Sequence, residues 1–499
     1  MEYNEKYASQ VEVVVEKKRF RNNILIITIF ILVAILSINI KLSIVGIALI
    51  FLITFLYKPL WWVYFMLTYL TFEILIQNFV PGSLVGVLRY GTEGFSYIVL
   101  FTSIIISLAK KRKVKLYIYD KSIIAFILFS IIAALINDVD TKIFIMGLRW
   151  LVRYVVIYFI FKFNSFSKTE LKRLVKYFYF LIIIQLSIGL LQFVFRSKLD
   201  VILKQKVIEL EYHTIESVQS ESKYAIFSTF GRYGEYAYFV TLAVTFLFAK
   251  YVFDKKKRSL VLLGIALVVL ILTYARQAAV GVIISILFYI YFNRDKRSIS
   301  KTKISAILVI ITISVGIYFV YNDFQRGKGV LGESMSQRYL SIFSIDFIKE
   351  DYSGKGRTYF LTTVNKKFIE NKPLIGYGVG MYGTEPAIKY DQSVYTELNI
   401  PTRFSMDVYW ISILGQLGLV GIFLLFRCYY LFYRECKSNY INNRDFKEFI
   451  SLFIRLSFIA IMIQSFFGSN LSDRYQAFYI WMFFGIFDSI KTIEINKEK

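Results

Sequence analysis

The sequence predicts an all-α, polytopic integral membrane protein with about fourteen transmembrane helices. Three observations lead to this fold class. Hydrophobic residues make up 57% of the 499 residues, the mean hydropathy is +0.55, and the chain has only five prolines. A water-soluble domain cannot bury that much apolar surface, whereas a lipid bilayer accepts it without a partner.

Each span is expected where a run of mostly apolar residues approaches the length of about 20 that crosses a bilayer. The expected spans are 23–40, 42–57, 60–80, 92–109, 120–136, 143–161, 177–195, 235–252, 259–274, 278–292, 304–320, 405–427, 449–467 and 476–490. Residues 1–320 would hold the first eleven, with a smaller loop at 196–234. A large, partly helical loop at 321–404 separates them from the last three, in residues 405–499.

The basic residues between the spans predict the orientation. Lysines and arginines concentrate in alternate loops, as the positive-inside bias requires of cytoplasmic segments. These loops are 110–115, 162–176, 254–258, 293–303 and 427–447. Both termini are therefore expected in the cytoplasm of a cell whose inner, cytoplasmic membrane holds the protein. The loops 81–91, 137–142, 196–234, 321–404 and 468–476 then lie outside.

Composition narrows the chemistry. The net charge of +25 is spread over short clusters between spans, which indicates topology rather than nucleic-acid binding. The single histidine, His213, excludes a His-based metal centre, and Cys428 and Cys436 form neither a disulfide framework nor a zinc site. Neither a metal nor a cofactor is expected.

Two arginines occupy an apolar run where charge is costly. Arg149 and Arg153 lie one helical turn apart in the expected span 143–161. An arginine at that depth faces a partner or a cavity. Three alternatives stay open: an ion pair with a carboxylate such as Glu73, snorkelling of the side chain to the interface, or a cationic lining for a lipid-attached phosphate.

Further arginines are expected at the outer membrane surface. Arg276 lies in the tight turn 273–277 between two spans, and Arg232 precedes the span 235–252. A guanidinium stays charged and can bind phosphate oxygens through two N–H groups, so it suits a lipid head group. An ordinary interfacial anchor is the alternative for Arg276.

The outer segment ends with a glycine string and an aspartate. Gly376, Gly378 and Gly380 could present backbone amides to an anion, or could allow a close crossing of the chain. Their spacing matches neither a P-loop nor a dinucleotide fingerprint. Asp407 opens the next helix, either as a cap or as a general base.

Several motifs together resemble a known family. In order they are 273–279 (TYARQAA), 336–340 (SQRYL), 354–357 (GKGR), the expected helix 357–371, 371–380 (NKPLIGYGVG) and 414–421 (LGQLGLVG). This order resembles the bacterial O-antigen ligase and O-antigen polymerase superfamily. The resemblance covers roughly residues 225–430.

The resemblance implies a metal-independent, GT-C-like glycosyltransferase whose donor is an undecaprenyl-diphosphate-linked glycan. Arg276, Arg338 and Arg357 would bind the diphosphate. Ligases carry a His-Asn pair where this chain has Asp407 and Val408, which favours a polymerase. The implied partners are the lipid-linked donor and acceptor, membrane lipid, a chain-length regulator and a flippase. A ligase, a glycan flippase and a non-enzymatic scaffold remain alternatives.

Overall fold

The computed structural model describes residues 51–204, 225–292, 345–436 and 445–495. Throughout these ranges every regular element is helical. The chain divides into two units, residues 1–63 and 64–499. The described part of the first unit, 51–63, is largely helical and includes the start of α3 (Pro59–Gln77). The features below belong to the second unit.

Six described helices are long and apolar enough to cross a membrane, or seven spans if one bent pair is included. The six are α3, α4 (Gly82–Ala109), α5 (Ile118–Ile136), α8 (Lys168–Val194), α11 (Tyr233–Asp254) and α21 (Tyr409–Glu435). Four shorter or more polar helices also occupy expected spans: α12 (Lys257–Leu272), α13 (Arg276–Phe292), α22 (Phe446–Gln464) and α23 (Arg474–Ile495). The all-α fold is confirmed for the described residues, which include six or seven helices able to span a membrane by length and composition, but the count of fourteen is not confirmed. The expected spans 23–40 and 304–320 lie outside the described residues.

Two sequence-based boundaries were wrong. The expected span 143–161 is broken into α6 (Thr141–Leu151) and α7 (Val155–Phe163), which meet at 65°. Tyr154 takes a left-handed conformation there, with φ of 60°. The segment 81–91, expected as a loop, belongs to α4 from Gly82 onward. Arg149 and Arg153, near the break, pair with Glu93, which follows the segment 81–91. These charges are therefore neutralised inside the protein and do not have to lie in a solvent-exposed loop.

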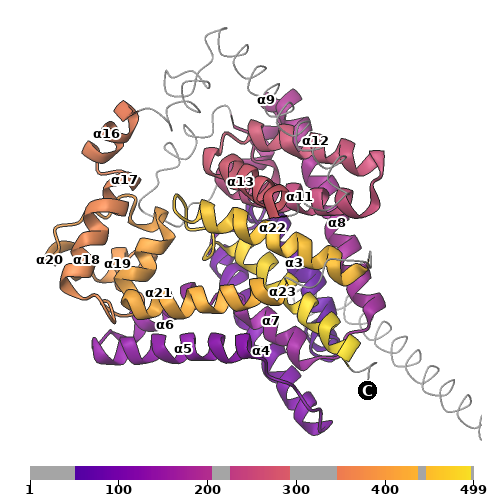
Figure 1. Ribbon diagram of the computed structural model, residues 1–499, viewed down its shortest axis with the longest axis horizontal. Coiled ribbons are helices and arrows are strands. Elements are labelled where there is room, and N and C mark those ends of the chain that lie inside the picture. Colours follow the sequence, from indigo (N-terminus) through magenta and orange to yellow (C-terminus); the bar gives the residue numbers. More distant parts are fainter. Residues whose placement is uncertain (1–50, 205–224, 293–344, 437–444, 496–499) are drawn as a thin grey trace, which may run out of the picture. The chain divides into compact units, whose positions relative to one another are not determined.

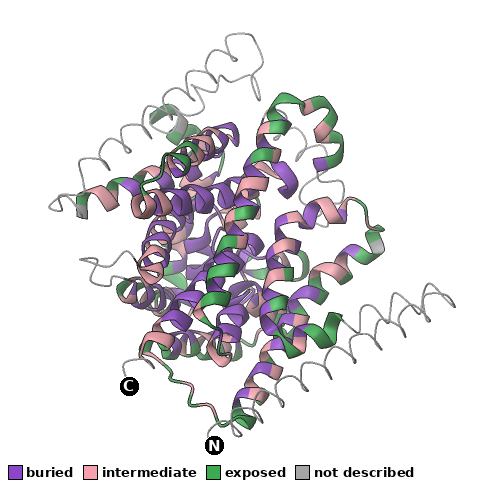
Figure 2. Ribbon diagram, turned by 90° about the vertical axis from the view of Figure 1, so that its right-hand side faces the viewer, coloured by how far each residue is buried: buried purple, intermediate pink, exposed green. Residues whose placement is uncertain are grey.

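The helices pack in pairs around a buried interior. Helix α13 packs against α22, α7 against α23, α11 against α12, and α21 runs beside α5 (Figure 1). Figure 2 shows the buried residues gathered inside the bundle and the exposed ones on its outward faces. The buried stretch of α11 runs from Tyr236 to Ala249 without interruption, so this helix lies at the centre of its neighbours.

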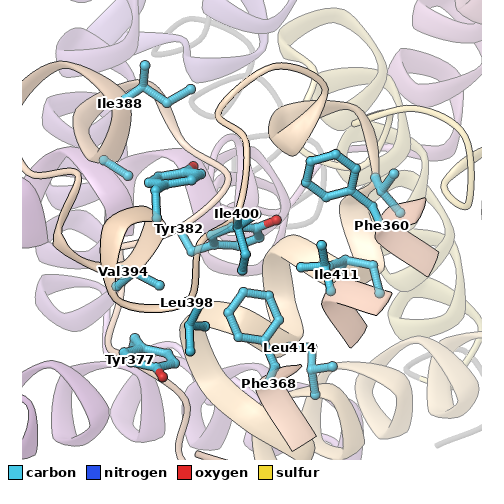
Figure 3. Packing of buried hydrophobic residues seen from close by; sticks show 14 residues of the cluster. Phe360, Phe368, Tyr377, Tyr382, Ile388, Val394, Leu398, Ile400, Ile411 and Leu414 are labelled. Atoms are coloured by element: carbon cyan, nitrogen blue, oxygen red, sulfur yellow. The ribbon is translucent and has the colours of Figure 1, made fainter. Parts of the chain in front are cut away.

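The outer segment has a small hydrophobic core of its own. The run 357–371 is helical as expected, through α17 (Arg357–Tyr359), the π-helical η3 (Phe360–Val364) and α18 (Asn365–Asn371), and it stops before Pro373. Phe360 and Phe368 from this run pack with Tyr382 and with Ile411 of α21 (Figure 3). Three more helices complete the segment: α16 (Ile345–Ser353), α19 (Glu385–Tyr390) and α20 (Ser393–Glu397).

Helix α21 is interrupted at Gly418, and the glycine-rich segment fills the interruption. Gly418 has φ of 62° and ψ of −165° within the helix. Backbone groups released there are satisfied by the chain at 373–378. Leu419 N–H donates to the Pro373 carbonyl at 2.8 Å, and the Gln416 carbonyl accepts from Gly378 N–H at 2.9 Å. Exposed backbone groups at membrane depth are costly, so this exchange fixes the outer segment to α21.

The smaller segment at 196–234 is also partly helical. It contains α9 (Arg196–Leu203) and the 3-10 turn η1 (Ser228–Phe230). Gln192, at the end of α8, accepts the backbone N–H groups of Phe227 and Ser228 and so holds the end of this segment on the bundle. His213 lies outside the described residues.

Candidate active site

Five charged side chains from α3, α4, α6, the break between α6 and α7, and the first residue of α23 meet inside the bundle. We call them the arginine cluster: Glu73, Glu93, Arg149, Arg153 and Arg474. Arg474 contacts Glu73, and its Nε lies 3.2 Å from Oε1 of Glu93. Arg149 donates to Glu93 at 2.5 Å, and Arg153 Nε lies 3.6 Å from the same carboxylate. Three guanidinium groups thus surround two carboxylates, which leaves one net positive charge.

These contacts show that Arg149 and Arg153 form ion pairs inside the protein, which was one of the alternatives for them. Both arginines have a carboxylate partner, but that partner is Glu93, and the suggestion of Glu73 was wrong. Glu73 is taken by Arg474, whose side chain is 6% exposed. Arg153 also donates to the Ser472 carbonyl at 3.2 Å, so it holds the turn before α23.

Arg357 and Asp407 form a separate, more accessible ion pair. Arg357 Nη2 lies 2.9 Å from Asp407 Oδ2, and the two side chains are 37% and 39% exposed. Burial lowers the pKa of Arg357, but the neighbouring Asp407 outweighs it and the net shift is upward, so the guanidinium remains charged. Asp407 ends the 3-10 turn η4 (Ser405–Asp407), and Val408 takes the N-cap position of α21. The capping alternative for Asp407 was therefore wrong.

Tyr238 lies within electrostatic range of the ion pair and of Asp473, the residue next to Arg474 of the arginine cluster. This buried residue near the start of α11 interacts with Arg357, Asp407 and Asp473, and with the side chain of Gln277. Asp473 lies beside Arg153 and Arg474, and its carboxylate accepts the backbone N–H groups of Tyr475 and Gln476 at 3.0 and 3.1 Å. The pair and the cluster are thus parts of one charged region.

Three further arginines were predicted at the site: Arg276, Arg232 and Arg338. Arg276 is the first residue of α13, directly after a turn in which Tyr274 has φ of 64°, so the tight turn is confirmed. Its neighbour Gln277 reaches the charged region through Tyr238. Arg232 lies 3.9 Å from Glu235 at the start of α11, with 28% of its side chain exposed. Arg338 lies outside the described residues.

The glycine string serves a close crossing of the chain. The N–H groups of Gly378 and Gly380 donate to the backbone and side chain of Gln416, and Gly376 N–H donates to the Lys372 carbonyl. A Cβ on Gly380 would lie 2.5 Å from the Ile143 carbonyl oxygen, in addition to a strained φ of +88°. The expectation of an anion site at Gly376, Gly378 and Gly380 was wrong, because protein acceptors already occupy their amides.

Several buried polar atoms around the arginine cluster and the Arg357–Asp407 pair lack hydrogen-bond partners within the described ranges. Among the described residues, buried polar atoms without a hydrogen-bond partner include Glu73 Oε2, Glu235 Oε2, Arg357 Nε and both amide atoms of Gln476. Such atoms cost about 1–3 kcal/mol each and are uncommon in folded proteins. The described part of the chain holds no group of three or more His, Cys, Asp or Glu that could bind a metal ion. The chemistry offered by these side chains is guanidinium and carboxylate chemistry.

A second buried charged group lies at the other end of α7 and differs in character. We call it the lysine cluster: Lys162, Asp120, Asp488, Tyr119 and Tyr158. Lys162 Nζ lies 2.8 Å from Asp120 and 3.1 Å from Asp488, and each carboxylate also accepts a tyrosine hydroxyl. All three charged side chains are at most 3% exposed.

The sequence did not point to three residues of this region: Glu93, Arg474 and Tyr238. One signal was available for Glu93, a carboxylate at the second position of the expected apolar span 92–109. Arg474 was read as part of an outer loop. Tyr238 gave no signal, since a tyrosine near the end of a span is common at membrane interfaces.

The fold and the site define a class: a polytopic helical membrane protein with arginines and carboxylates collected beside a folded, membrane-anchored segment. The family model described as O-antigen ligase matches residues 261–426. Those residues therefore form a domain of the O-antigen polymerase and ligase superfamily, as the motifs indicated. The match includes Arg276, Arg357 and Asp407. The comparison with curated proteins finds no significant match. The matched domain implies a glycan-transferring enzyme of the O-antigen ligase or polymerase kind.

Proposed function

We propose that the protein polymerises undecaprenyl-diphosphate-linked oligosaccharide repeat units into a surface polysaccharide such as O-antigen, capsule or exopolysaccharide. The reaction takes place on the outer face of the cytoplasmic membrane. The observation that carries this proposal is the Arg357–Asp407 pair, which presents a permanent cation and a carboxylate together, both partly exposed, beside further arginines.

In the proposed reaction the growing lipid-linked glycan is the donor, and a hydroxyl of a lipid-linked repeat unit is the acceptor. The hydroxyl oxygen attacks the anomeric carbon and inverts it, and its proton passes to Asp407. The bond from the anomeric carbon to the phosphate oxygen breaks, and its electron pair leaves with the undecaprenyl diphosphate. Cationic groups already in place stabilise the charge on that leaving group.

The arginines divide the work in this proposal. Arg357, Arg276 and Arg338 bind the diphosphate. Arg149 and Arg232 are partly exposed, at 24% and 28%, and extend the cationic lining toward the substrate. Arg153 is more deeply buried and acts through the arginine cluster, which holds the turn before α23 in place.

The experiment that tests the proposal uses purified full-length protein in lipid nanodiscs with a synthetic undecaprenyl-diphosphate repeat unit. Nucleotide and added metal are left out, and the products are sized. The proposal expects a ladder of glycans that differ by one repeat. The absence of extension with repeat units from the native host would contradict it.

Ligase-type transfer is the second candidate, favoured by the description of the matching family. The aspartate at 407, where ligases carry histidine, favours the polymerase. A non-repeat acceptor added to the same assay separates the two. Transfer of finished glycan to that acceptor without a ladder would support the ligase, and lipid scrambling without bond formation would support a flippase.

A further inference from the structure

The Arg357–Asp407 pair raises a question about the order of events. Asp407 Oδ2 is engaged by Nη2 of Arg357 at 2.9 Å. A general base needs a carboxylate oxygen within hydrogen-bond reach of the hydroxyl that it deprotonates. The same guanidinium is the group assigned to the diphosphate. In the unliganded arrangement Oδ2 of Asp407 and Nη2 of Arg357 are therefore engaged with each other.

We propose that the pair is an exchangeable latch: the donor's diphosphate takes Arg357 from Asp407, and only then can Asp407 receive the acceptor hydroxyl. This inference rests on the proposed function and adds to it a fixed order, donor before acceptor. An acceptor that arrived first would meet a carboxylate still held by Arg357.

The geometry suits an exchange. Both side chains are more than one-third exposed, so the pair can be reached without unfolding any element. Arg357 Nε is buried without a hydrogen-bond partner among the described residues, so part of the hydrogen-bonding capacity of the guanidinium is unused while it holds Asp407. A diphosphate offers several oxygens and more negative charge than one carboxylate, and it can engage the planar fork through two bonds.

The backbone on either side is fixed, so the exchange needs only side-chain movement. Thr358 N–H donates to Asp351 at 2.7 Å, which anchors the helical turn that begins at Arg357. Phe360 is fully buried in the core of the outer segment. On the other side Ser405 is buried, and its hydroxyl donates to the Thr402 carbonyl at 2.6 Å. Rotation of the Arg357 guanidinium is sufficient to release the carboxylate.

Removing the competing carboxylate should strengthen diphosphate binding, whereas removing an ordinary binding residue weakens it. We would measure the affinity of the full-length protein in nanodiscs for undecaprenyl diphosphate, which has no sugar and cannot react. Asp407→Asn should bind this lipid about two- to five-fold more tightly than the wild type, since exposed ion pairs are worth that range. Chain extension by the same variant should be lost. Asp407→Ser serves as a second variant should the amide disturb folding.

Glu370→Gln is the matched control, because it removes one negative charge from the same outer segment. Glu370 is exposed and pairs with Lys366, not with Arg357. Equal tightening by this control would show a general charge effect and overturn the latch. Unchanged or weaker binding by both folded Asp407 variants would also overturn it, while a wild type that still binds and polymerises would keep the proposed function. Failure of the wild type to bind undecaprenyl diphosphate would overturn the donor site, and the latch with it.

Discussion

The arginine cluster and the lysine cluster lie at opposite ends of α7 and both include a residue of α23. They differ in how far the hydrogen-bonding capacity of their charged groups is satisfied. Arg153 precedes α7 and Lys162 lies near its end, and α7 itself is about 14 Å long. In the lysine cluster each carboxylate binds both Lys162 and a tyrosine hydroxyl, so its bonding is complete. In the region of the arginine cluster, Glu73, Glu235 and Gln476 keep buried atoms without hydrogen-bond partners in the described structure. A network whose hydrogen bonds are all made stabilises the fold, whereas one with unsatisfied polar atoms can bind a polar or charged ligand.

The largest expected effect is on the lysine cluster. Lys162→Met leaves two buried carboxylates without their cation, and breaking such a pair costs about 3–5 kcal/mol of unfolding free energy. Chemical denaturation in detergent measures it. Lys366→Met, at a side chain that is 76% exposed, is the control and should be nearly neutral. Similar stability of both variants would mean that the lysine cluster is not a structural element.

Arg357→Ala should greatly reduce activity and only slightly reduce stability. Chain extension should fall by about 10²–10³-fold, the usual cost of losing one stabilising group at a developing negative charge. The unfolding free energy should fall by less than about 1 kcal/mol, because the pair is exposed. Product sizing and denaturation of the same preparation give both numbers, with Lys366→Ala as the control. Normal polymer length from the variant would remove Arg357 from the site.

Gly380→Ala tests whether the close crossing of the glycine string with α6 is needed for stability and for activity. The new Cβ would press on the Ile143 carbonyl at a left-handed backbone, a strain of about 1–3 kcal/mol. We expect lower stability and reduced extension together. Gly264→Ala is the matched control, since a Cβ there meets nothing within 4 Å. A Gly380 variant with full activity and stability would show that the crossing tolerates looser packing.

The smallest expected effect concerns pH. Burial raises the pKa of Asp473 above its usual value of about 3.9, against opposing hydrogen bonds from Gln476 and Tyr475 and the charge of Arg153. A raised folded-state pKa favours the protonated fold, so its contribution is complete below about pH 3.9 and is lost as the pH rises through the folded pKa. Asp473→Asn keeps a good helix cap and removes the titration.

Unfolding free energies of the wild type and the Asp473 variant, measured at several pH values, provide the check. The wild type should lose more stability than the variant as the pH rises above about 4. Parallel curves would mean that the ionisation of Asp473 is not linked to folding. Asp391→Asn, in the outer segment, controls for the loss of one titrating group.

Sequence reasoning identified the parts of this molecule that follow local rules. Apolar runs predicted the long helices, the short polar break at 273–277 predicted a tight turn, and the apolar rhythm of 357–371 predicted a helix that ends before Pro373. It failed where distant residues decide the outcome. The break between α6 and α7 lies beside the contacts of Arg149 and Arg153 with Glu93, from another helix.

The site was predictable only in part for the same reason. Guanidinium chemistry at Arg357 and the acid at Asp407 could be proposed from motifs, but their contact joins residues fifty positions apart. The glycine string had two physical explanations that sequence alone could not separate. Only the acceptors of Gly378 and Gly380, both on Gln416, decide between them.

The hydrogen bonds shared between the interrupted helix α21 and residues 373–378 have a mechanical consequence. Asp407 lies two residues before the N-terminus of that helix, and the run 357–371, which begins with Arg357, packs against the helix through η3 and α18. A change in the tilt of α21 therefore carries acid and cation as one body and preserves their spacing. Bilayer thickness and lateral pressure, which act on helix tilt, would shift the Arg357–Asp407 pair in height relative to the bilayer without separating its two members.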